Sequence, residues 1–196
     1  IRSLTSGQFK EALRRLGRRE ADLTLLTDDS VWLLGSADES TELLGSLDGS
    51  PSQVLIGELD GDGWTEVVVL TDEGVSLWGR SEATAWSERP LEPALAAAAG
   101  LGNAVLVDFE HDGDLDLLAT DPSGQLLLVT HRGESGLGAP QPAPLPGVGR
   151  VTLVRTVDLD GDVDQDLLIV EGETLRVLTN WRQGEFRPSQ DLAFDG

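Results

Sequence analysis

The sequence predicts an all-β fold, a partial β-propeller of about four four-stranded antiparallel blades with a short N-terminal helix. Short runs rich in Val, Leu and Ile alternate with segments of Gly, Asp, Ser and Pro, which is the pattern of short strands joined by tight turns. One unit also recurs every 50 residues. Repeats of about 40 to 50 residues with several strands each are typical of propeller blades, and a solenoid of β-sheets is the less favoured alternative.

Three acidic segments mark this repeat, at residues 58–66, 108–116 and 158–166. Each is followed by an apolar run, a turn and a second apolar run, so the unit has the order strand, acidic loop, strand, turn, strand. A further stretch in each unit is expected to form a fourth, outer strand, because its prolines suit an edge position. These stretches are residues 92–95, 140–145 and 185–192.

Charge divides the chain into a basic N-terminal segment and the repeats. Residues 1–20 contain an excess of arginine, and their apolar side chains recur at helical spacing, so we expect a basic amphipathic helix or the tail of a preceding domain. The stretch after it matches the second half of a repeat but has no acidic loop before it. We therefore expect an incomplete first blade and three complete ones. Their expected bounds are residues 21–50, 51–100, 101–150 and 151–196.

The composition excludes several functional classes. The formal net charge of −21 repels nucleic acid and favours cations or basic partners, so we expect no nucleic-acid partner. The absence of cysteine excludes disulfide frameworks, thiolate metal sites and cysteine nucleophiles. No apolar run approaches the roughly 20 residues that a membrane-spanning helix needs, so we expect no membrane span.

The acidic loops have the spacing of a metal site, with carboxylates at positions 1, 3, 5 and 9 of a nine-residue template. Oxygen ligands at alternating positions of a short turn can converge, and their charges repel unless a hard cation neutralises them. Ca²⁺ fits because it accepts about six to eight oxygens with tolerant geometry, including a position 7 carbonyl and a bidentate position 9. We expect up to three Ca²⁺ ions. The expected ligands are Glu58, Asp60, Asp62, Trp64, Glu66, Asp108, Glu110, Asp112, Asp114, Asp116, Asp158, Asp160, Asp162, Asp164 and Asp166.

Details of the loops narrow this interpretation. An EF-hand is excluded, because its twelfth position would fall inside an apolar run. Val163 occupies position 6, where Gly63 and Gly113 tolerate positive φ, so the third loop is either distorted or holds a strained residue. We expect a structural ion, because a site closed by protein oxygens leaves no position for substrate. His111 and His131 are isolated in the sequence, and we assign no role to them.

The loops and their flanking strands resemble the FG-GAP and VCBS family of repeats, which build β-propellers such as the head of integrin α subunits and many secreted bacterial proteins. The resemblance covers residues 21–196 in outline and is most specific at the three loops. It implies that each loop joins two adjacent strands of a blade and binds calcium, and that a full ring has about seven blades. It also implies an extracellular or periplasmic location.

No catalytic motif accompanies these loops: the sequence contains no G-x-S-x-G elbow, phosphate-binding loop or H-E-x-x-H. We therefore expect a non-enzyme, a calcium-binding propeller segment that acts as a structural scaffold or as an interaction module for a protein or glycan partner. The alternative is a non-catalytic or partial domain of a larger secreted enzyme, such as a polysaccharide-degrading one. Four blades do not close a ring, so we expect further blades, another subunit or another protein to cover the ends.

Overall fold

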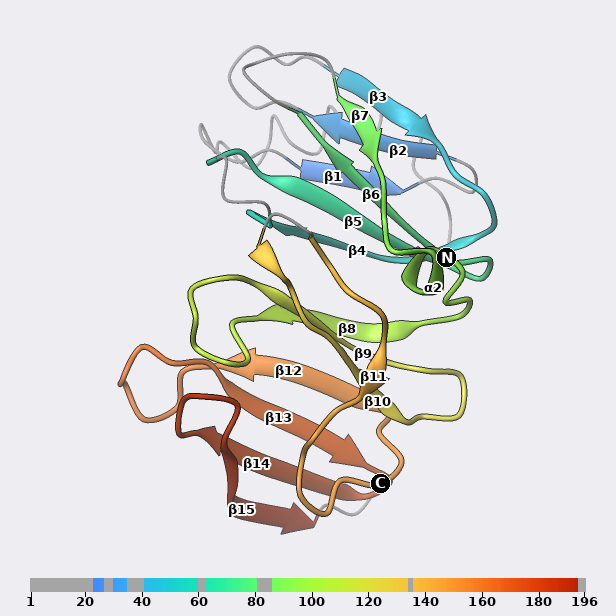
Figure 1. Cartoon of the computed structure of the whole chain (residues 1–196). Helices are drawn as coiled ribbons and strands as arrows, with labels where there is room; N and C mark the ends of the chain where they lie inside the picture. The colour runs from blue at the N-terminus through green and yellow to red at the C-terminus, as the bar shows by residue number, and fades with distance from the viewer. Residues whose placement is uncertain are drawn as a thin grey trace, which may run out of the picture.

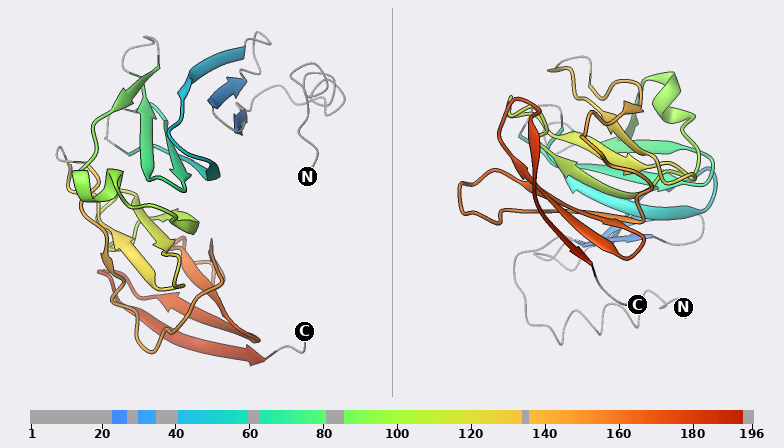
Figure 2. Two further views of the ribbon diagram at one scale, coloured as in Figure 1. Left: turned by 90° about the vertical axis from the view of Figure 1, so that its right-hand side faces the viewer. Right: turned by 90° about the horizontal axis from the view of Figure 1, so that it is seen from below.

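The computed structural model describes residues 23–26, 30–34, 41–59, 63–80, 86–133 and 136–193. Four antiparallel sheets make up this part of the chain and follow one another along an open arc (Figures 1 and 2). The predicted all-β architecture is therefore confirmed. The predicted N-terminal helix falls within residues 1–20, which lie outside the described residues.

Every sheet is a meander in which consecutive strands are neighbours. The first sheet contains β1 (Leu23–Leu26), β2 (Ser30–Leu34) and β3 (Thr41–Ser46). The second contains β4 (Pro51–Gly57), β5 (Glu66–Thr71), β6 (Val75–Gly79) and β7 (Ser87–Arg89). The third contains β8 (Gly102–Val107), β9 (Asp116–Thr120), β10 (Leu126–Val129) and β11 (Gln141–Pro142). The fourth contains β12 (Leu153–Val157), β13 (Asp166–Glu171), β14 (Thr174–Asn180) and β15 (Phe186–Ala193).

The first strands of neighbouring sheets lie beside one another, β4 next to β8 and β8 next to β12. They belong to separate sheets, so side chains make the polar links between them. The amide of Gln53 on β4 donates to the carbonyl of Ala104 on β8 at 2.7 Å and accepts from its N–H at 2.8 Å. This pair of hydrogen bonds satisfies the N–H and the C=O of Ala104 on β8, an edge strand of its sheet.

The second strand of the second and third sheets is packed on both faces, as β5 shows. Successive side chains of a strand point to opposite faces. Val67 and Val69 pack into the apolar core between the first and second sheets, whereas Val68 and Leu70 pack into the core between the second and third. All six residues of β5 are buried. A strand covered on both faces appears in the sequence as an unbroken apolar run, which is the pattern observed here.

Three separate cores hold the four sheets together, one between each pair of neighbours. The first includes Val31, Leu44 and Trp78. The second includes Leu95, Leu101 and Leu117, and the third includes Leu118, Leu167 and Phe186. In the described part of the chain, each core thus lies between two adjacent sheets, as in other repeat proteins whose stability is approximately a sum over adjacent units.

The expected outer strands are partly wrong. Residues 92–95 do not form a strand: Pro93–Ala96 is a short helix, α2, and the outer strand of the second sheet is β7, earlier in the chain. The helix begins with proline, which is favourable at a first helical position, and continues with alanine, the best helix former. The Glu92 side chain accepts a hydrogen bond from the N–H of Ala94 at 3.1 Å, and Leu95 is fully buried. Strands β11 and β15 do fall at the two other expected stretches.

Within the described part of the chain, no helix has the length and apolar character needed to cross a bilayer.

Candidate metal centres

Each acidic loop joins the first strand of a sheet to the second. Residues 58–65 follow β4 and precede β5, residues 108–115 connect β8 to β9, and residues 158–165 connect β12 to β13. The loops therefore occur at the same place in three successive sheets, and position 9 of the template is the first residue of the second strand. The second and third loops project on the left in Figure 1.

The position 9 carboxylate is buried in all three loops, with Glu66, Asp116 and Asp166 each 1% exposed. In each loop it accepts a hydrogen bond from the N–H of position 2. The three donors are Leu59, Phe109 and Leu159, at 2.7, 2.9 and 2.9 Å. The second oxygen of the two aspartates accepts from the end of the third strand or just beyond it, from His131 N–H after β10 at 2.7 Å and from Asn180 N–H at the end of β14 at 2.8 Å. Position 9 therefore ties the start of the loop to its end and to the adjacent strand.

The second loop is folded around Asp108 at position 1. Its two oxygens accept hydrogen bonds from the N–H groups of Asp112 and Gly113, each at 3.0 Å. The side chain of Asp112 in turn accepts from the N–H of Asp114 at 3.0 Å. Such side-chain to main-chain bonds are how aspartate stabilises tight turns, and here they hold the carboxylates of positions 1 and 5 on a compact loop.

In the part of the chain that the structure describes, Glu110, at position 3 of the second loop, has an unpartnered carboxylate oxygen and a raised pKa. Its Oε2 atom is covered and has no hydrogen-bond partner within the described residues. Burial, together with the like charges of Asp116, Asp112 and Asp108, raises the pKa of Glu110 from its usual 4.5 to about 7. Positions 1, 3, 5 and 9 thus face one another without a counter-charge. An arrangement of this kind favours either a proton or a cation.

The third loop brings its carboxylates closest together. One oxygen from each of Asp158, Asp160 and Asp166 lies within 4.8 Å of the others. Partial desolvation and the like charges of Asp162 and Asp166 raise the pKa of Asp160. Asp158 also accepts hydrogen bonds from the N–H groups of Gly161 and Val163, at 2.7 and 3.1 Å, which folds this loop like the second. Positions 1, 3 and 9 therefore converge, and Asp162 at position 5 is not part of this group.

The first loop is described only at its ends. Asp60 and Asp62 lie outside the described residues. Glu58 is exposed, and Trp64 is half-buried beneath the guanidinium group of Arg80, which lies 4.6 Å from the centre of its ring. Glu66 at position 9 is buried and accepts from the Leu59 N–H, so the first loop has the same main-chain hydrogen bond as the other two. The arrangement of its other expected ligands stays a prediction.

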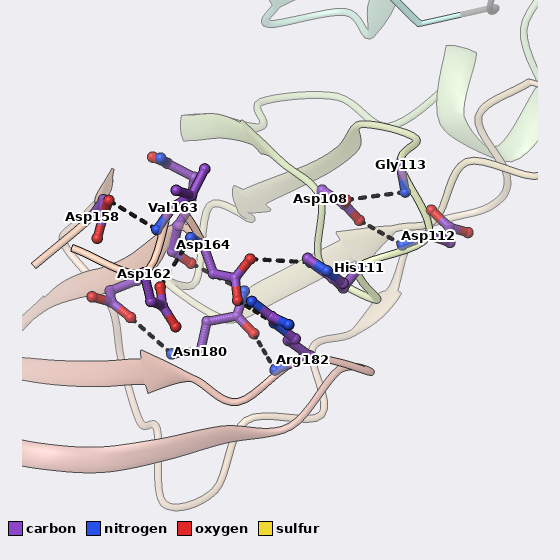
Figure 3. A network of polar contacts seen from close by, with 12 residues as sticks. Asp108, His111, Asp112, Gly113, Asp158, Asp162, Val163, Asp164, Asn180 and Arg182 are labelled. Atoms are coloured by element: carbon purple, nitrogen blue, oxygen red, sulfur yellow. Dashed lines mark hydrogen bonds and ion pairs between the residues drawn. The ribbon is translucent and has the colours of Figure 1, made fainter. Parts of the chain in front are cut away.

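The side chains at position 7 contact basic groups, and both histidines take part. Asp114 Oδ2 lies 3.2 Å from His131 Nδ1. Asp164 Oδ1 lies 3.2 Å from His111 Nδ1, and its Oδ2 accepts a 2.6 Å hydrogen bond from Arg182 Nε (Figure 3). The histidines therefore have contacts that no local spacing in the sequence indicated. The expected metal ligand at position 7 is the main-chain carbonyl oxygen. These contacts involve only the side-chain oxygens of Asp114 and Asp164.

Position 6 has positive φ in all three loops, +81° at Gly63, +96° at Gly113 and +80° at Val163. Of the two alternatives for the third loop, the structure shows the strained residue, because the backbone keeps the conformation of the other loops. The Val163 side chain is 82% exposed and so gains little from packing. A β-branched residue in this region is uncommon and costs free energy.

Position 2 has a role that the sequence analysis does not assign. Leu59 and Phe109 are buried in the second and third cores, and the Phe109 ring lies 4.7 Å from that of Phe186. In the last sheet the equivalent Leu159 is 52% exposed. The first and second loops therefore anchor themselves in the interface with the following sheet. The signal was present, since position 2 is apolar in all three loops.

The family model for the FG-GAP-like repeat matches residues 58–119 and 108–169, which together span more than half of the chain. The chain belongs to the FG-GAP-like repeat family. Each match begins at position 1 of an acidic loop and ends inside the second strand of the following sheet. Each matched segment therefore contains two successive loops and spans the sheet interface between them.

A solved structure supports the same fold. The chain is similar to a lectin from Agrocybe aegerita, whose structure was described for its specific recognition of non-reducing terminal N-acetylglucosamine, with a TM-score of 0.62 and 16% sequence identity. The match covers 88% of this chain and 48% of the lectin, so the chain spans about half the length of that protein. No curated protein matches the chain in sequence. The predicted partial β-propeller is confirmed, with three strands described in its first blade.

Proposed function

We propose that this FG-GAP-like chain is a calcium-binding β-propeller segment that acts as a structural scaffold and interaction module. The observation that carries the proposal is the convergence of Asp158, Asp160 and Asp166, with ligand oxygens within 4.8 Å of one another. None of the basic side chains in the described residues forms an ion pair with these three. The same anchored loop recurs in the second and third blades, so the arrangement belongs to the repeat.

The donor set fits calcium better than other metals. All expected donors are oxygens, which Ca²⁺ binds at about 2.3–2.6 Å in flexible geometry, whereas Mg²⁺ demands a stricter octahedron. The covered Oε2 of Glu110 has no hydrogen-bond partner in the described part of the chain and supplies a donor that a cation would satisfy. A bound ion supplies positive charge. In the third loop, the chain's own residues hold the loop closed through position 9 and bring the carboxylates of positions 1, 3 and 9 together.

The role that follows is structural rather than catalytic. The loop carboxylates anchor to main-chain groups of the same sheet, and the position 2 side chains Leu59 and Phe109 anchor the loops in the interface with the next. An ion that orders the loop thereby stabilises two neighbouring blades. We propose a non-enzyme in the extracellular or periplasmic space, where calcium is abundant enough to occupy such sites.

The open end of the propeller favours an interaction role. Leu153, Val170, Leu175 and Leu192 are paired across the four strands of the last sheet, on the face turned away from the third sheet. On earlier sheets the equivalent face is buried against the next blade. Further blades, another subunit, or a protein or glycan partner would cover it. The alternative is that the chain is a non-catalytic or partial domain of a larger secreted enzyme, such as a polysaccharide-degrading one.

Calorimetric calcium titration and thermal unfolding test the proposal. We expect calcium to raise the melting temperature and to bind at up to three sites, because carboxylates that face one another gain a counter-charge. Asp160→Asn should remove one site, whereas the matched change Glu173→Gln, in an exposed turn of the same sheet, should remove none. An identical melting curve in calcium and in chelator would contradict the proposal.

A further inference from the structure

We propose that Asp164 is a positioning residue that joins the second and third loops, through His111, so that calcium binding in one favours binding in the other. This inference rests on the proposed calcium function. It concerns a cluster of three side chains, Asp164, His111 and Arg182, which we call the bridge (Figure 3).

The bridge connects two blades. His111 is at position 4 of the second loop, in the third sheet, and Asp164 is at position 7 of the third loop, in the fourth sheet. The Asp164 side chain is 6% exposed, and its two oxygens are divided between partners, His111 Nδ1 at 3.2 Å and Arg182 Nε at 2.6 Å. Arg182 supplies the opposite charge and His111 contacts the other oxygen, so this buried carboxylate is held from both sides.

On the side of the third loop, the bridge reaches two expected ligands. The Asp164 N–H donates to Asp162 Oδ1 at 3.0 Å. The Arg182 N–H donates to the side chain of Asn180 at 2.8 Å, and the Asn180 N–H donates to Asp166 Oδ1 at 2.8 Å. The bridge therefore holds positions 5 and 9 of the third loop as well as the main chain at position 7.

On the side of the second loop, the bridge is part of the ligand-bearing main chain. His111 lies between the expected ligands Glu110 and Asp112 and has a φ of +61°. An ion that orders those two side chains also fixes the backbone that carries the imidazole ring. Binding at the second loop then places His111 against Asp164 and reduces the ordering entropy that the third loop must lose when it binds its own ion.

Among the residues that the structure describes, no equivalent bridge leads to the first loop. Asp114, the position 7 residue of the second loop, contacts His131, which follows β10 in the same sheet. Position 4 of the first loop is Gly61, which has no side chain to reach a neighbour. The coupling is therefore specific to the second and third loops.

A mutant cycle read by calorimetry tests the coupling. In an Asp60→Ala background, which disables the first loop, the calcium affinity of the second loop is measured with the third loop intact and with it disabled by Asp160→Ala. With His111 present, we expect disabling the third loop to weaken binding at the second about fivefold, the lower end of typical coupling between sites. With His111→Gly, we expect no difference.

His111→Gly suits this test because glycine occupies position 4 of the other two loops and adopts positive φ without strain. His111→Asn should restore part of the coupling, since asparagine tolerates positive φ and can donate a hydrogen bond. Arg187→Gln is the matched control: it removes a guanidinium group that pairs with Glu185 in the same sheet as Asp164 and lies outside the bridge, and we expect it to leave the coupling intact. Circular dichroism of each variant without calcium verifies folding.

The outcomes separate the two proposals. Two sites that bind calcium independently in the His111 protein, or coupling that persists in His111→Gly, overturn the bridge and leave the calcium function standing. Absence of calcium binding at both loops overturns the calcium function and the coupling with it.

Discussion

At the scale of single residues, the loops combine local turn chemistry with one strained position. Asp108 and Asp158 fold their loops through hydrogen bonds to main-chain N–H groups, which short polar side chains make readily. Val163 keeps a conformation that costs an L-residue roughly 1–2 kcal/mol. Because its side chain is exposed, no packing offsets that cost.

Val163→Gly should therefore stabilise the protein. Glycine relieves the backbone strain but adds entropy to the unfolded chain, so we expect a net gain of roughly 0.5–1 kcal/mol in the free energy of unfolding, measured with urea. Gly113→Val is the reciprocal change in the second loop. A Cβ atom there would meet nothing within 4 Å, so only the backbone penalty applies and we expect destabilisation of similar origin. A gain in the second variant, or a loss in the first, would contradict this account.

At the scale of the element, the acidic loop is a unit whose charges are unbalanced without an ion. Burial and three neighbouring carboxylates raise the pKa of Glu110 to about 7.

The strand order and the placement of the loops between the first and second strands could be predicted from the sequence, because turn residues and apolar runs are local signals. From the sequence we expect a strand where α2 forms. The outer strand β7 lies earlier in the chain, so Pro93–Ala96 is not needed in the sheet and forms a short helix.

The raised pKa of Glu110 predicts a pH dependence for the metal-free protein. The folded state binds the Glu110 proton more tightly than the unfolded state, whose pKa is near the usual 4.5. The stabilisation from this group is therefore complete below about pH 4.5 and is lost as the pH rises through about 7. We expect the melting temperature in chelator to fall over that range by more in the wild type than in Glu110→Gln. Parallel pH profiles for the two proteins would show that Glu110 carries no such shift.

At the scale of the whole molecule, the sheets form an arc whose two ends do not meet (Figure 2). The last sheet leaves apolar side chains partly exposed, including Leu159 at 52% and Leu192 at 44%. On the preceding sheets the residue equivalent to Leu159 is buried in an interface, as Phe109 is. The open face therefore has the composition of an interface without its partner.

Leu192→Lys tests this reading of the end face. A contiguous apolar surface binds hydrophobic dyes, so we expect the isolated chain to enhance dye fluorescence and the variant to reduce that enhancement. Gln125→Lys, an exposed change of the same charge on the third sheet, should leave the fluorescence unchanged. Equal dye binding by all three proteins would show that the face is not the exposed apolar surface.

The sequence by itself determined the period, the strands and the loops, because alternation, turn residues and ligand spacing act over a few residues. It also located Val163 at the position that requires positive φ. Only the tertiary structure decided which side chains make contacts between blades: Phe109 packs against Phe186, and His111 contacts Asp164. Those contacts depend on how two sheets pack, and packing across an interface leaves no periodic signature in either segment that forms it.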